Sequence, residues 1–393
     1  VARVLKGSPQ DFPKSGRIGE GLRPLLGNSV FLTNGAEWER QRRIIDPAFE
    51  GGRLRDTFPA MLAAAEAAVA RLGGKTGRPV EIEAETSHAA ADVIFRTLFS
   101  IPIEHEVAAQ VFTRFRSYQR SQPILNLAAL VPLPAWMPRF FRRSTKRDAA
   151  EIRALITRLT AERMAEIEAG SAPDDLASKI MTARDPQTGE TFGTQEMADQ
   201  VAIFFLAGHE TSASALAWTL YLMALYPEWQ DRVAQEAQAL PEWSFRTVSG
   251  LKLSKDVFRE ALRLYPPVPM MVREAQCPHE FRGREVKPGS QVVLSPWHLQ
   301  RHERLWERPD AFDPGRWGTE NGKQCLRDAF IPFSAGPRVC TGAGFAMIEG
   351  VLILSRILKD FRVAPVQGRD PVPAAHLTVR SKNGIWLQLT RRG

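Results

Sequence analysis

The chain has 393 residues, of which 44% are hydrophobic, enough to bury a large core. Its 52 basic and 44 acidic residues leave a net charge of +8, which favours an acidic partner. Nucleic-acid binding is disfavoured because no basic run is interleaved with aromatic residues, and no apolar run approaches the ~20 residues of a transmembrane segment. The three cysteines cannot all pair, which indicates a reducing, cytoplasmic location.

No linker, repeat or low-complexity tract divides the sequence, so we expect a single domain over residues 1–393. The chain opens with Val1 inside an element and without an initiator methionine, which indicates that a preceding segment is missing. From Gln10 to Asn34 the sequence is rich in glycine and proline, and we predict a loop.

A helix is predicted from Asn34 to the residue before Pro47, and it places Trp38 and Arg42 four residues apart on one face. An indole N–H beside a guanidinium can clamp a carboxylate, but the same spacing also suits an ordinary amphipathic pair. The 3.6-residue apolar period predicts further helices over 54–72, 81–98, 104–119 and 145–170.

Residues 123–141 are apolar but are interrupted by four prolines, so they cannot form one helix. Two interpretations remain open. The segment is either a well-packed loop or an apolar lid over a substrate entrance that touches a membrane surface.

The longest helical pattern runs from Thr194 to Tyr226, and its middle is hydrophobic on all sides, which is typical of a buried helix. This stretch nevertheless contains Gly208, which costs ~1 kcal/mol against alanine, and Glu210, an acid that needs a partner. Either the helix tolerates a kink with Glu210 in a wet cavity, or Glu210 and the neighbouring Thr211 carry chemistry.

Glu260 and Arg263 share one face of a predicted helix that is stopped by two prolines. Such a pair is commonly a weak surface ion pair, so by itself it indicates little. An extended strand over 268–273 is predicted next, and its methionines either pack in the core or line a permissive cavity.

Two β-hairpins are predicted near the carboxyl end of the chain, over 281–295 with a turn at Lys287 and over 378–389 with a turn at Lys382. His279, His298 and His302 do not share the spacing of metal ligands, and we interpret them as surface or structural residues.

Cys340 lies in a glycine-containing loop that leads into an apolar helical stretch over 345–358. Near a helix N-terminus the backbone N–H groups and the helix dipole favour a thiolate, which is either a nucleophile or a metal ligand. A buried, inert cysteine is the alternative. A haem satisfies the surrounding residues best, with iron for the sulfur, a flat face for Gly336, Gly342 and Gly344, and propionates for Arg338.

The fixed positions of this loop, Phe333, Gly336, Arg338, Cys340 and Gly342, resemble the haem-binding signature of the cytochrome P-450 family, F-x-x-G-x-R-x-C-x-G. Four further motifs follow the order of that family: W-x-x-x-R, A/G-G-x-D/E-T, E-x-x-R and P-x-x-F-x-P-x-R. The resemblance covers essentially the whole chain, which lacks the N-terminal strand and helix that members of the family usually have before this point. It implies a mainly α cytochrome P-450 fold with small β-sheets, of the bacterial soluble type.

The resemblance also implies one haem b, bound through the Cys340 thiolate, and insertion of one oxygen atom from O2 into an apolar organic substrate. Glu210 and Thr211 would deliver protons in an oxygen-binding groove, and Arg263 and Arg316 would hold Glu260 in a buried structural network. The implied haem contacts are Trp38, Arg42, Arg273, Phe333, Gly336, Arg338 and Gly342. The implied walls of the substrate pocket are Phe204, Ala207, Gly208, Val268, Met270 and Met271.

The sequence contains no dinucleotide fingerprint and no cysteine cluster for an iron–sulfur centre, so the electrons must come from elsewhere. We expect an acidic ferredoxin or flavodoxin that docks on the basic face near Cys340, or a reductase formerly fused to the chain. A peroxygenase or isomerase on the same fold and a non-catalytic haem protein are the alternatives, and the pair Glu210–Thr211 disfavours both.

Overall fold

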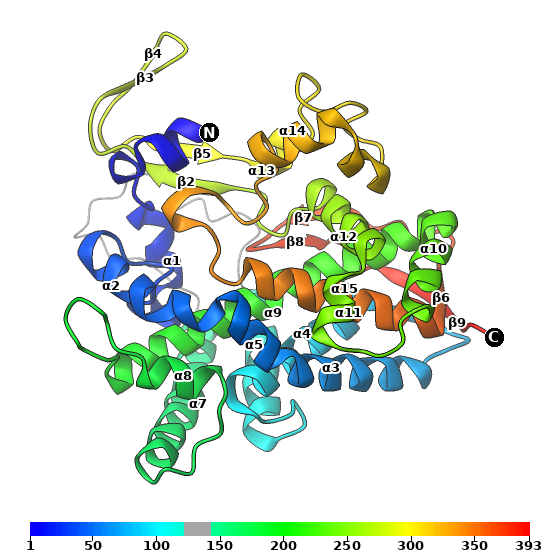
Figure 1. The fold of residues 1–393 in the computed structure, drawn as a ribbon. Coiled ribbons are helices and arrows are strands. Elements are labelled where there is room, and N and C mark those ends of the chain that lie inside the picture. Colours follow the sequence, from blue (N-terminus) through cyan, green and yellow to red (C-terminus); the bar gives the residue numbers. More distant parts are fainter. Residues whose placement is uncertain (122–142) are drawn as a thin grey trace.

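The computed structural model describes residues 1–121 and 143–393, and most of these residues are helical (Figure 1). The longer helices begin and end within three residues of the expected positions. The α-helices are α1 (Gly16–Leu26), α2 (Gly35–Ile45), α3 (Gly51–Gly73), α4 (Ile82–Phe99), α5 (Glu106–Ser121), α7 (Arg143–Glu168), α8 (Leu176–Thr182), α9 (Thr194–Leu225), α10 (Pro227–Gln238), α11 (Phe245–Ser249), α12 (Lys252–Leu264), α13 (Pro296–Leu299), α14 (Glu320–Asp328) and α15 (Ala343–Asp360).

The strands form small antiparallel sheets at the edges of the helical body. One sheet has the order β1-β9-β6, and the other three are the pairs β2–β5, β3–β4 and β7–β8. This mainly α arrangement with small sheets confirms the expected fold class. The strands are β1 (Pro79–Glu81), β2 (Met271–Glu274), β3 (His279–Phe281), β4 (Arg284–Val286), β5 (Gln291–Leu294), β6 (Phe361–Pro365), β7 (Pro373–Ala375), β8 (Val379–Ser381) and β9 (Trp386–Arg391).

Helix α9 runs through the middle of the molecule, with α4 and α15 beside it (Figure 1). Helix α9 is buried because apolar residues cover all its sides. Gly208 allows α4 to approach closely, because a Cβ atom there would lie 2.5 Å from Ile94 Cδ1. Farther along α9, Trp218 is fully buried and stacks on Tyr265 with 4.1 Å between ring centroids. The helix that carries Glu210 and Thr211 is therefore held by the core on both sides of these residues.

The loop predicted over residues 10–34 is wrong in its middle, where α1 forms. Leu22, Leu25 and Leu26 lie on the buried side of this helix and belong to the main hydrophobic core. Burying a leucine side chain contributes about 1.5–3 kcal/mol, which offsets the cost of glycines in a helix. Composition alone therefore gave the wrong element.

The predicted partners of the carboxyl-terminal strands are also wrong. A turn does form at Lys287, where the Ser290 N–H donates to Lys287 O at 3.1 Å, but the strands on its two sides do not pair with each other. The hairpin of this region turns instead at Arg282–Gly283, where both residues have positive φ angles of 53° and 76°. Strand β5 pairs with β2, and the strands expected around Lys382 pair separately, β8 with β7 and β9 with β1 and β6. Pairing between distant segments cannot be deduced from alternation within one segment.

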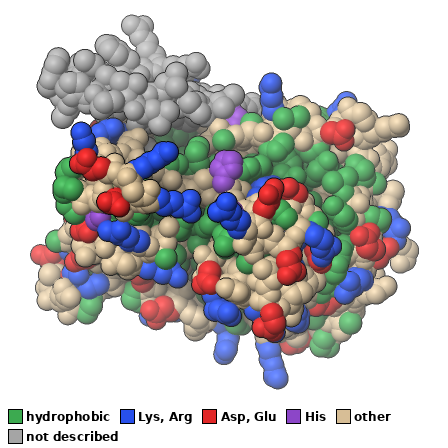
Figure 2. Space-filling view, turned by 90° about the horizontal axis from the view of Figure 1, so that it is seen from above, with side chains coloured by type: hydrophobic (Ala, Val, Ile, Leu, Met, Phe, Trp, Pro, Cys, Tyr) green, Lys and Arg blue, Asp and Glu red, His purple; other side chains and the backbone are tan. Residues whose placement is uncertain are grey.

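On the face seen from above, basic and acidic side chains are interspersed, and hydrophobic side chains gather in one broad area beside them (Figure 2). Within the part of the chain that the structure describes, no helix combines the length and apolar character needed to cross a membrane. The apolar segment 123–141, with its two interpretations, lies outside the described residues.

Candidate functional site

Cys340 lies between a short 3-10 helix, η5 (Gly336–Arg338), and the start of α15. The Cys340 N–H donates to Phe333 O at 2.9 Å, so the loop closes on itself and presents the side chain outward. The sulfur is exposed on the loop, yet surrounding protein raises the pKa of the thiol by burial, against the opposing effects of the Gly342 N–H, Arg42 and Lys14. A metal cation on the sulfur would act in the opposite direction and favour the thiolate.

The glycines of the loop differ in their surroundings. Gly336 has φ +72°, and a Cβ atom there would lie 1.9 Å from Leu5 O, in the π-helical turn η1 (Arg3–Gly7). A Cβ atom on Gly344 would lie 3.0 Å from Leu54 Cδ1, whereas a Cβ atom on Gly342 would have no described protein atom within 4 Å. Gly336 and Gly344 thus allow close approach of other parts of the protein, and Gly342 faces free space.

Helix α2 is tied to the cysteine loop by a chain of polar contacts. Arg42 donates from Nε to Asp46 Oδ2 at 2.8 Å and from Nη1 to Val339 O at 2.8 Å. Asp46 Oδ1 accepts from Thr341 Oγ1 at 3.0 Å. The Arg42 guanidinium carbon is 5.9 Å from the centroid of the Trp38 indole ring, so the two side chains predicted to share a helix face are neighbours.

Arg338 is the closer partner of Trp38, with 4.2 Å between its guanidinium carbon and the indole centroid. Its Nη2 donates to Thr33 O at 3.0 Å and to Asn34 Oδ1 at 2.7 Å, and its Nη1 is buried without a partner in the described residues. Arg273 is buried on β2, and its guanidinium donates to Val272 O. Burial lowers the pKa of both arginines, to about 10 for Arg338.

Lys14 was not predicted as a site residue. It forms an isolated antiparallel bridge with Arg273, and its Nζ donates to Phe31 O at 2.8 Å. Burial and then the charges of Arg338, Arg273 and Arg42 hold the pKa of Lys14 well below its usual range. No local signal marks this lysine, because the bridge joins segments that are far apart in the chain. The four cations share a small volume, and among the described residues only Arg42 has a carboxylate partner.

One stripe of α9 is less buried than the rest of the helix. Phe204, Ala207, Gly208 and Thr211 are partly or fully exposed, while nearly every neighbour is buried. Their spacing of three, one and three residues places them on one helix face. Phe49 packs against Phe204 with 5.6 Å between ring centroids and contacts Phe345 on α15, so this face lies on the side of the cysteine loop.

Glu210 and Thr211 are neighbours that point in different directions. The Thr211 hydroxyl donates to Ala207 O at 2.6 Å, one turn earlier on the helix. Glu210 is buried, and its Oε1 accepts from Thr378 Oγ1 at 3.0 Å and from Arg380 Nε at 3.4 Å. Its Oε2 is buried without a partner in the described residues. The acid is thus held by residues of and beside β8 that the sequence did not indicate.

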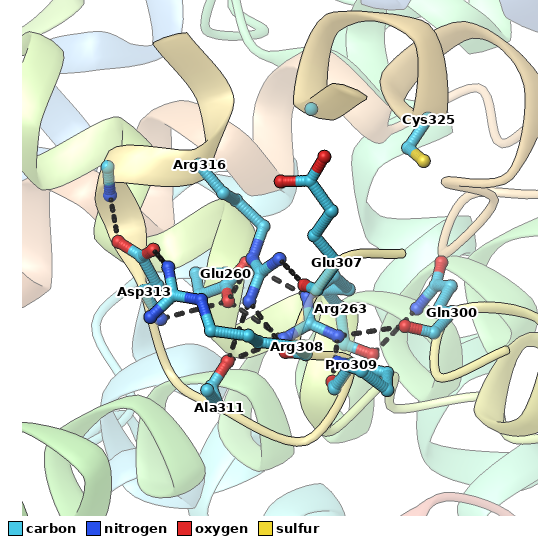
Figure 3. A network of polar contacts seen from close by, with 12 residues as sticks. Glu260, Arg263, Gln300, Glu307, Arg308, Pro309, Ala311, Asp313, Arg316 and Cys325 are labelled. Atoms are coloured by element: carbon cyan, nitrogen blue, oxygen red, sulfur yellow. Dashed lines mark hydrogen bonds and ion pairs between the residues drawn. The ribbon is translucent and has the colours of Figure 1, made fainter. Parts of the chain in front are cut away.

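Glu260 and Arg263 on α12 form the predicted network with Arg316 (Figure 3). Glu260 accepts from Arg263 through both carboxylate oxygens, at 2.8 and 3.0 Å, and from Arg316 at 2.8 Å. The arginines also donate to backbone carbonyls of 300 and 307–311. All three side chains are at most 4% exposed.

The remaining residues of the predicted substrate pocket differ in their exposure. Val268 and Met271 are half-buried, and Met270 is 48% exposed.

A family model described as cytochrome P-450 matches residues 1–388 of the chain. The chain belongs to the cytochrome P-450 family. This confirms the resemblance drawn from the five motifs, and the family is one in which a cysteine thiolate binds a haem iron.

The relatives include proteins named as a synthase, a monooxygenase and a hydroxylase. Cyclooctatin synthase of Streptomyces melanosporofaciens is 31% identical, over 93% of this chain and 80% of that protein. Cyclooctat-9-en-7-ol 5-monooxygenase of the same organism is 32% identical, over 94% of this chain and 79% of that protein. Cytokinin hydroxylase of Arabidopsis thaliana is 29% identical, over 94% of this chain and 73% of that protein, so the relatives extend beyond bacteria.

A crystal structure of a cytochrome P-450 haem domain matches the fold with a TM-score of 0.85 at 26% identity, covering 98% of this chain and 85% of that one. The expected cytochrome P-450 fold is thus confirmed. The family and the names of its monooxygenase members confirm the expected enzyme class: the chain is a haem monooxygenase and an oxidoreductase.

The residues present fit a haem. A propionate-bearing porphyrin brings two negative charges, and the buried, unpartnered Nη1 of Arg338 is a donor that such a charge would satisfy. Lys14 and Arg273 add donors without carboxylate partners in the described residues. The Cys340 sulfur and the exposed stripe of α9 offer an iron ligand and a wall for the opposite side.

Proposed function

We propose that this cytochrome P-450 binds haem b through Cys340 and hydroxylates or epoxidises an apolar organic molecule of moderate size. The observation that carries the proposal is the cluster of Lys14, Arg42, Arg273 and Arg338, whose charges act on one another and, through Lys14, on Cys340. When bound, the haem supplies the electron-transfer chemistry that activates O2. A haem carries two carboxylates and an iron, so it would interact with both the cation cluster and the Cys340 sulfur.

In this proposal the cations hold the two propionates. Arg338 binds one through Nη1 while Trp38 and the carbonyl of residue 33 fix its orientation. Lys14 and Arg273 approach from one antiparallel bridge, and Arg42 keeps α2 on the loop. Phe333 and Gly336 maintain the loop, and the free space around Gly342 leaves room for the porphyrin.

Glu210 and Thr211 are proposed to move protons. The hydroxyl hydrogen of Thr211 is directed to Ala207 O, so the oxygen lone pairs can accept a hydrogen bond from water on the exposed face of α9. Glu210 is the proton source: Thr378 and Arg380 hold its Oε1, and its Oε2 is available to donate when protonated. The two residues therefore perform separate tasks, with Thr211 positioning the acceptor and Glu210 supplying the proton.

The proposed substrate wall combines the exposed face of α9, made by Phe204, Ala207 and Gly208, with Val268 and the methionines 270 and 271. These side chains are apolar, which selects an apolar substrate. Two relatives support this choice, because they are named for oxidation of cyclooctat-9-en-7-ol and for oxygenation of pentalenene. We propose a substrate of that kind for this chain.

We further propose a separate electron donor of the ferredoxin or flavodoxin type, or a reductase once joined to the chain. The net charge of +8 supports an acidic donor.

A single domain over 1–393 is supported by the main core cluster, which includes residues from α1 to β9. A cytoplasmic location is supported by the cysteines, which are free in the structure.

The deciding experiment is the absorption spectrum of the reduced protein with and without carbon monoxide, compared with that of Cys340→His. A strongly red-shifted Soret band in the wild type and its loss in the variant are expected. A wild-type band at the position typical of imidazole ligation would overturn the assignment of Cys340. Oxygen uptake that requires both a reductase and substrate then separates monooxygenation from peroxide-driven chemistry.

A further inference from the structure

A second group of metal-binding side chains lies away from the cysteine loop, where the amino-terminal segment meets β3. His279 Nε2 is 3.3 Å from Cys277 Sγ and 3.6 Å from Asp11 Oδ2, and all three atoms lie within 4.8 Å of one another. Each residue is partly buried. The spacing of the histidines alone does not indicate this group. It joins His279 to Cys277, two residues earlier, and to Asp11, near the amino end of the chain.

The two partners converge on the same nitrogen of His279. A neutral imidazole nitrogen carries either one N–H or one lone pair, so Nε2 can satisfy one of these partners but not both. A catalytic Cys–His–Asp arrangement would place the acid on Nδ1 and the thiol on Nε2, which is not the geometry seen here. Three ligand atoms of different residues within 4.8 Å of one another can instead surround one cation.

The spacing suits zinc. Bonds of about 2.3 Å to sulfur and 2.0–2.1 Å to nitrogen and oxygen at tetrahedral angles place sulfur about 3.6 Å from nitrogen, and nitrogen about 3.3 Å from oxygen. The observed distances, 3.3 Å between Cys277 Sγ and His279 Nε2 and 3.6 Å between His279 Nε2 and Asp11 Oδ2, each lie within about 0.3 Å of these values. A thiolate, a carboxylate and a neutral imidazole also balance a divalent charge, and this mixed donor set is one that zinc accepts.

The surrounding structure holds the donors in place. The Gln276 N–H donates to Asp11 O at 2.9 Å, and the Glu274 N–H donates to Pro13 O at 3.0 Å, so Asp11 is fixed opposite the segment that carries Cys277. The His279 ring packs on Phe12 with 4.3 Å between centroids, and its side chain is only 7% exposed. Such support fixes ring orientation before a metal arrives.

We propose that Asp11 Oδ2, Cys277 Sγ and His279 Nε2 form a zinc site, with water at the fourth position. The metal would fasten the amino-terminal segment to the base of the β3–β4 hairpin. The same pair of segments carries Lys14 and Arg273 a few residues away, so the site also steadies that bridge.

The test is calorimetric titration of the haem-loaded, chelator-treated protein with zinc chloride. One zinc per chain is expected, and Cys277→Ala, His279→Ala and Asp11→Asn should each weaken binding by at least about 100-fold. Cys325→Ser and His298→Gln are matched controls that alter a cysteine and a histidine outside the cluster, and they should bind zinc as the wild type does. An unchanged spectrum of the reduced, carbon monoxide-bound protein shows that each variant is folded.

Zinc X-ray absorption provides a second measurement that does not depend on a variant. One sulfur scatterer at about 2.3 Å with nitrogen and oxygen at about 2.0 Å is expected. Absence of zinc binding, a shell without sulfur, or equal binding in Cys277→Ala would overturn the site. None of these results depends on how the haem is held, so they leave the proposed monooxygenase function untouched.

Discussion

The Arg338 guanidinium carbon lies 4.2 Å from the centroid of the Trp38 indole ring, which joins the cysteine loop to α2. The stacking leaves Nη1 of the arginine as a buried donor without a partner in the described residues. Arg338 is thus oriented before any ligand arrives, and the propionate it is proposed to bind meets a fixed, charged donor at little entropic cost.

Replacing Arg338 by glutamine should weaken haem retention while leaving the thiolate spectrum of the bound fraction intact. Loss of one charge-assisted hydrogen bond costs about 1.5–3 kcal/mol, so haem should leave about 10- to 100-fold faster. Transfer of haem to an excess of an apo-globin measures this rate. Arg23→Gln, which removes an exposed arginine of α1, is the control, and equal release rates in the two variants would show that Arg338 holds no propionate.

Thr211→Ala should reduce product formation by about 10- to 100-fold while consumption of reducing equivalents continues. The alanine lacks the oxygen that accepts a hydrogen bond on the exposed face of α9. Thr211→Ser keeps that oxygen and should recover most of the coupling between electron use and product. The ratio of product formed to reductant consumed is the measurement, and an unchanged ratio in the alanine variant would remove Thr211 from proton delivery.

Glu260→Gln should lower the free energy of unfolding by about 3–5 kcal/mol, because it leaves Arg263 and Arg316 buried without their anion. Denaturant unfolding of the haem-loaded protein measures the loss. Glu20→Gln removes an exposed partner of Arg23 and should change stability by less than about 0.5 kcal/mol. Similar midpoints for both variants would mean that the buried network does not stabilise the fold.

Glu349 on α15 predicts a pH dependence of stability. Burial raises its pKa to about 8, although Ser212 donates to its Oε2 at 2.6 Å. Between the ordinary carboxyl pKa and about 8 the unfolded chain has lost the proton and the folded chain has kept it, so this residue makes stability fall as pH rises. Glu349→Gln should flatten that part of the curve and stabilise the protein at pH 8. Unfolding midpoints of haem-loaded wild type and variant across pH 5–9 decide, and parallel curves would contradict the prediction.

Motifs with fixed spacing predicted the cysteine loop, the family and the long helices well, because each depends on residues close in the chain. Glu260 and Arg263, three apart on one helix, are an example, and Arg316 was added only by the family resemblance. What the sequence could not reveal was contact between distant segments. Lys14 reaches Arg273 through a single bridge, and Glu210 is held by Thr378 and Arg380.

Two errors have clear physical causes. The Gly- and Pro-rich composition of residues 10–34 predicted a loop, but three buried leucines make α1 a helix. Expected hairpins at Lys287 and Lys382 were drawn from local alternation, whereas the strands pair with partners farther away. In both cases tertiary packing outweighed a local preference.

The contact between Gly336 and Leu5 joins segments that are far apart in the chain. Closing so long a stretch of chain is slow, so we expect the loop that carries Cys340 to take its final shape only after the amino-terminal turn has docked against it. Capture of the cofactor is therefore expected late in folding, after the helical core has assembled. During synthesis the amino-terminal turn leaves the ribosome long before the loop of Cys340, so the turn stays without this contact until the loop has been made.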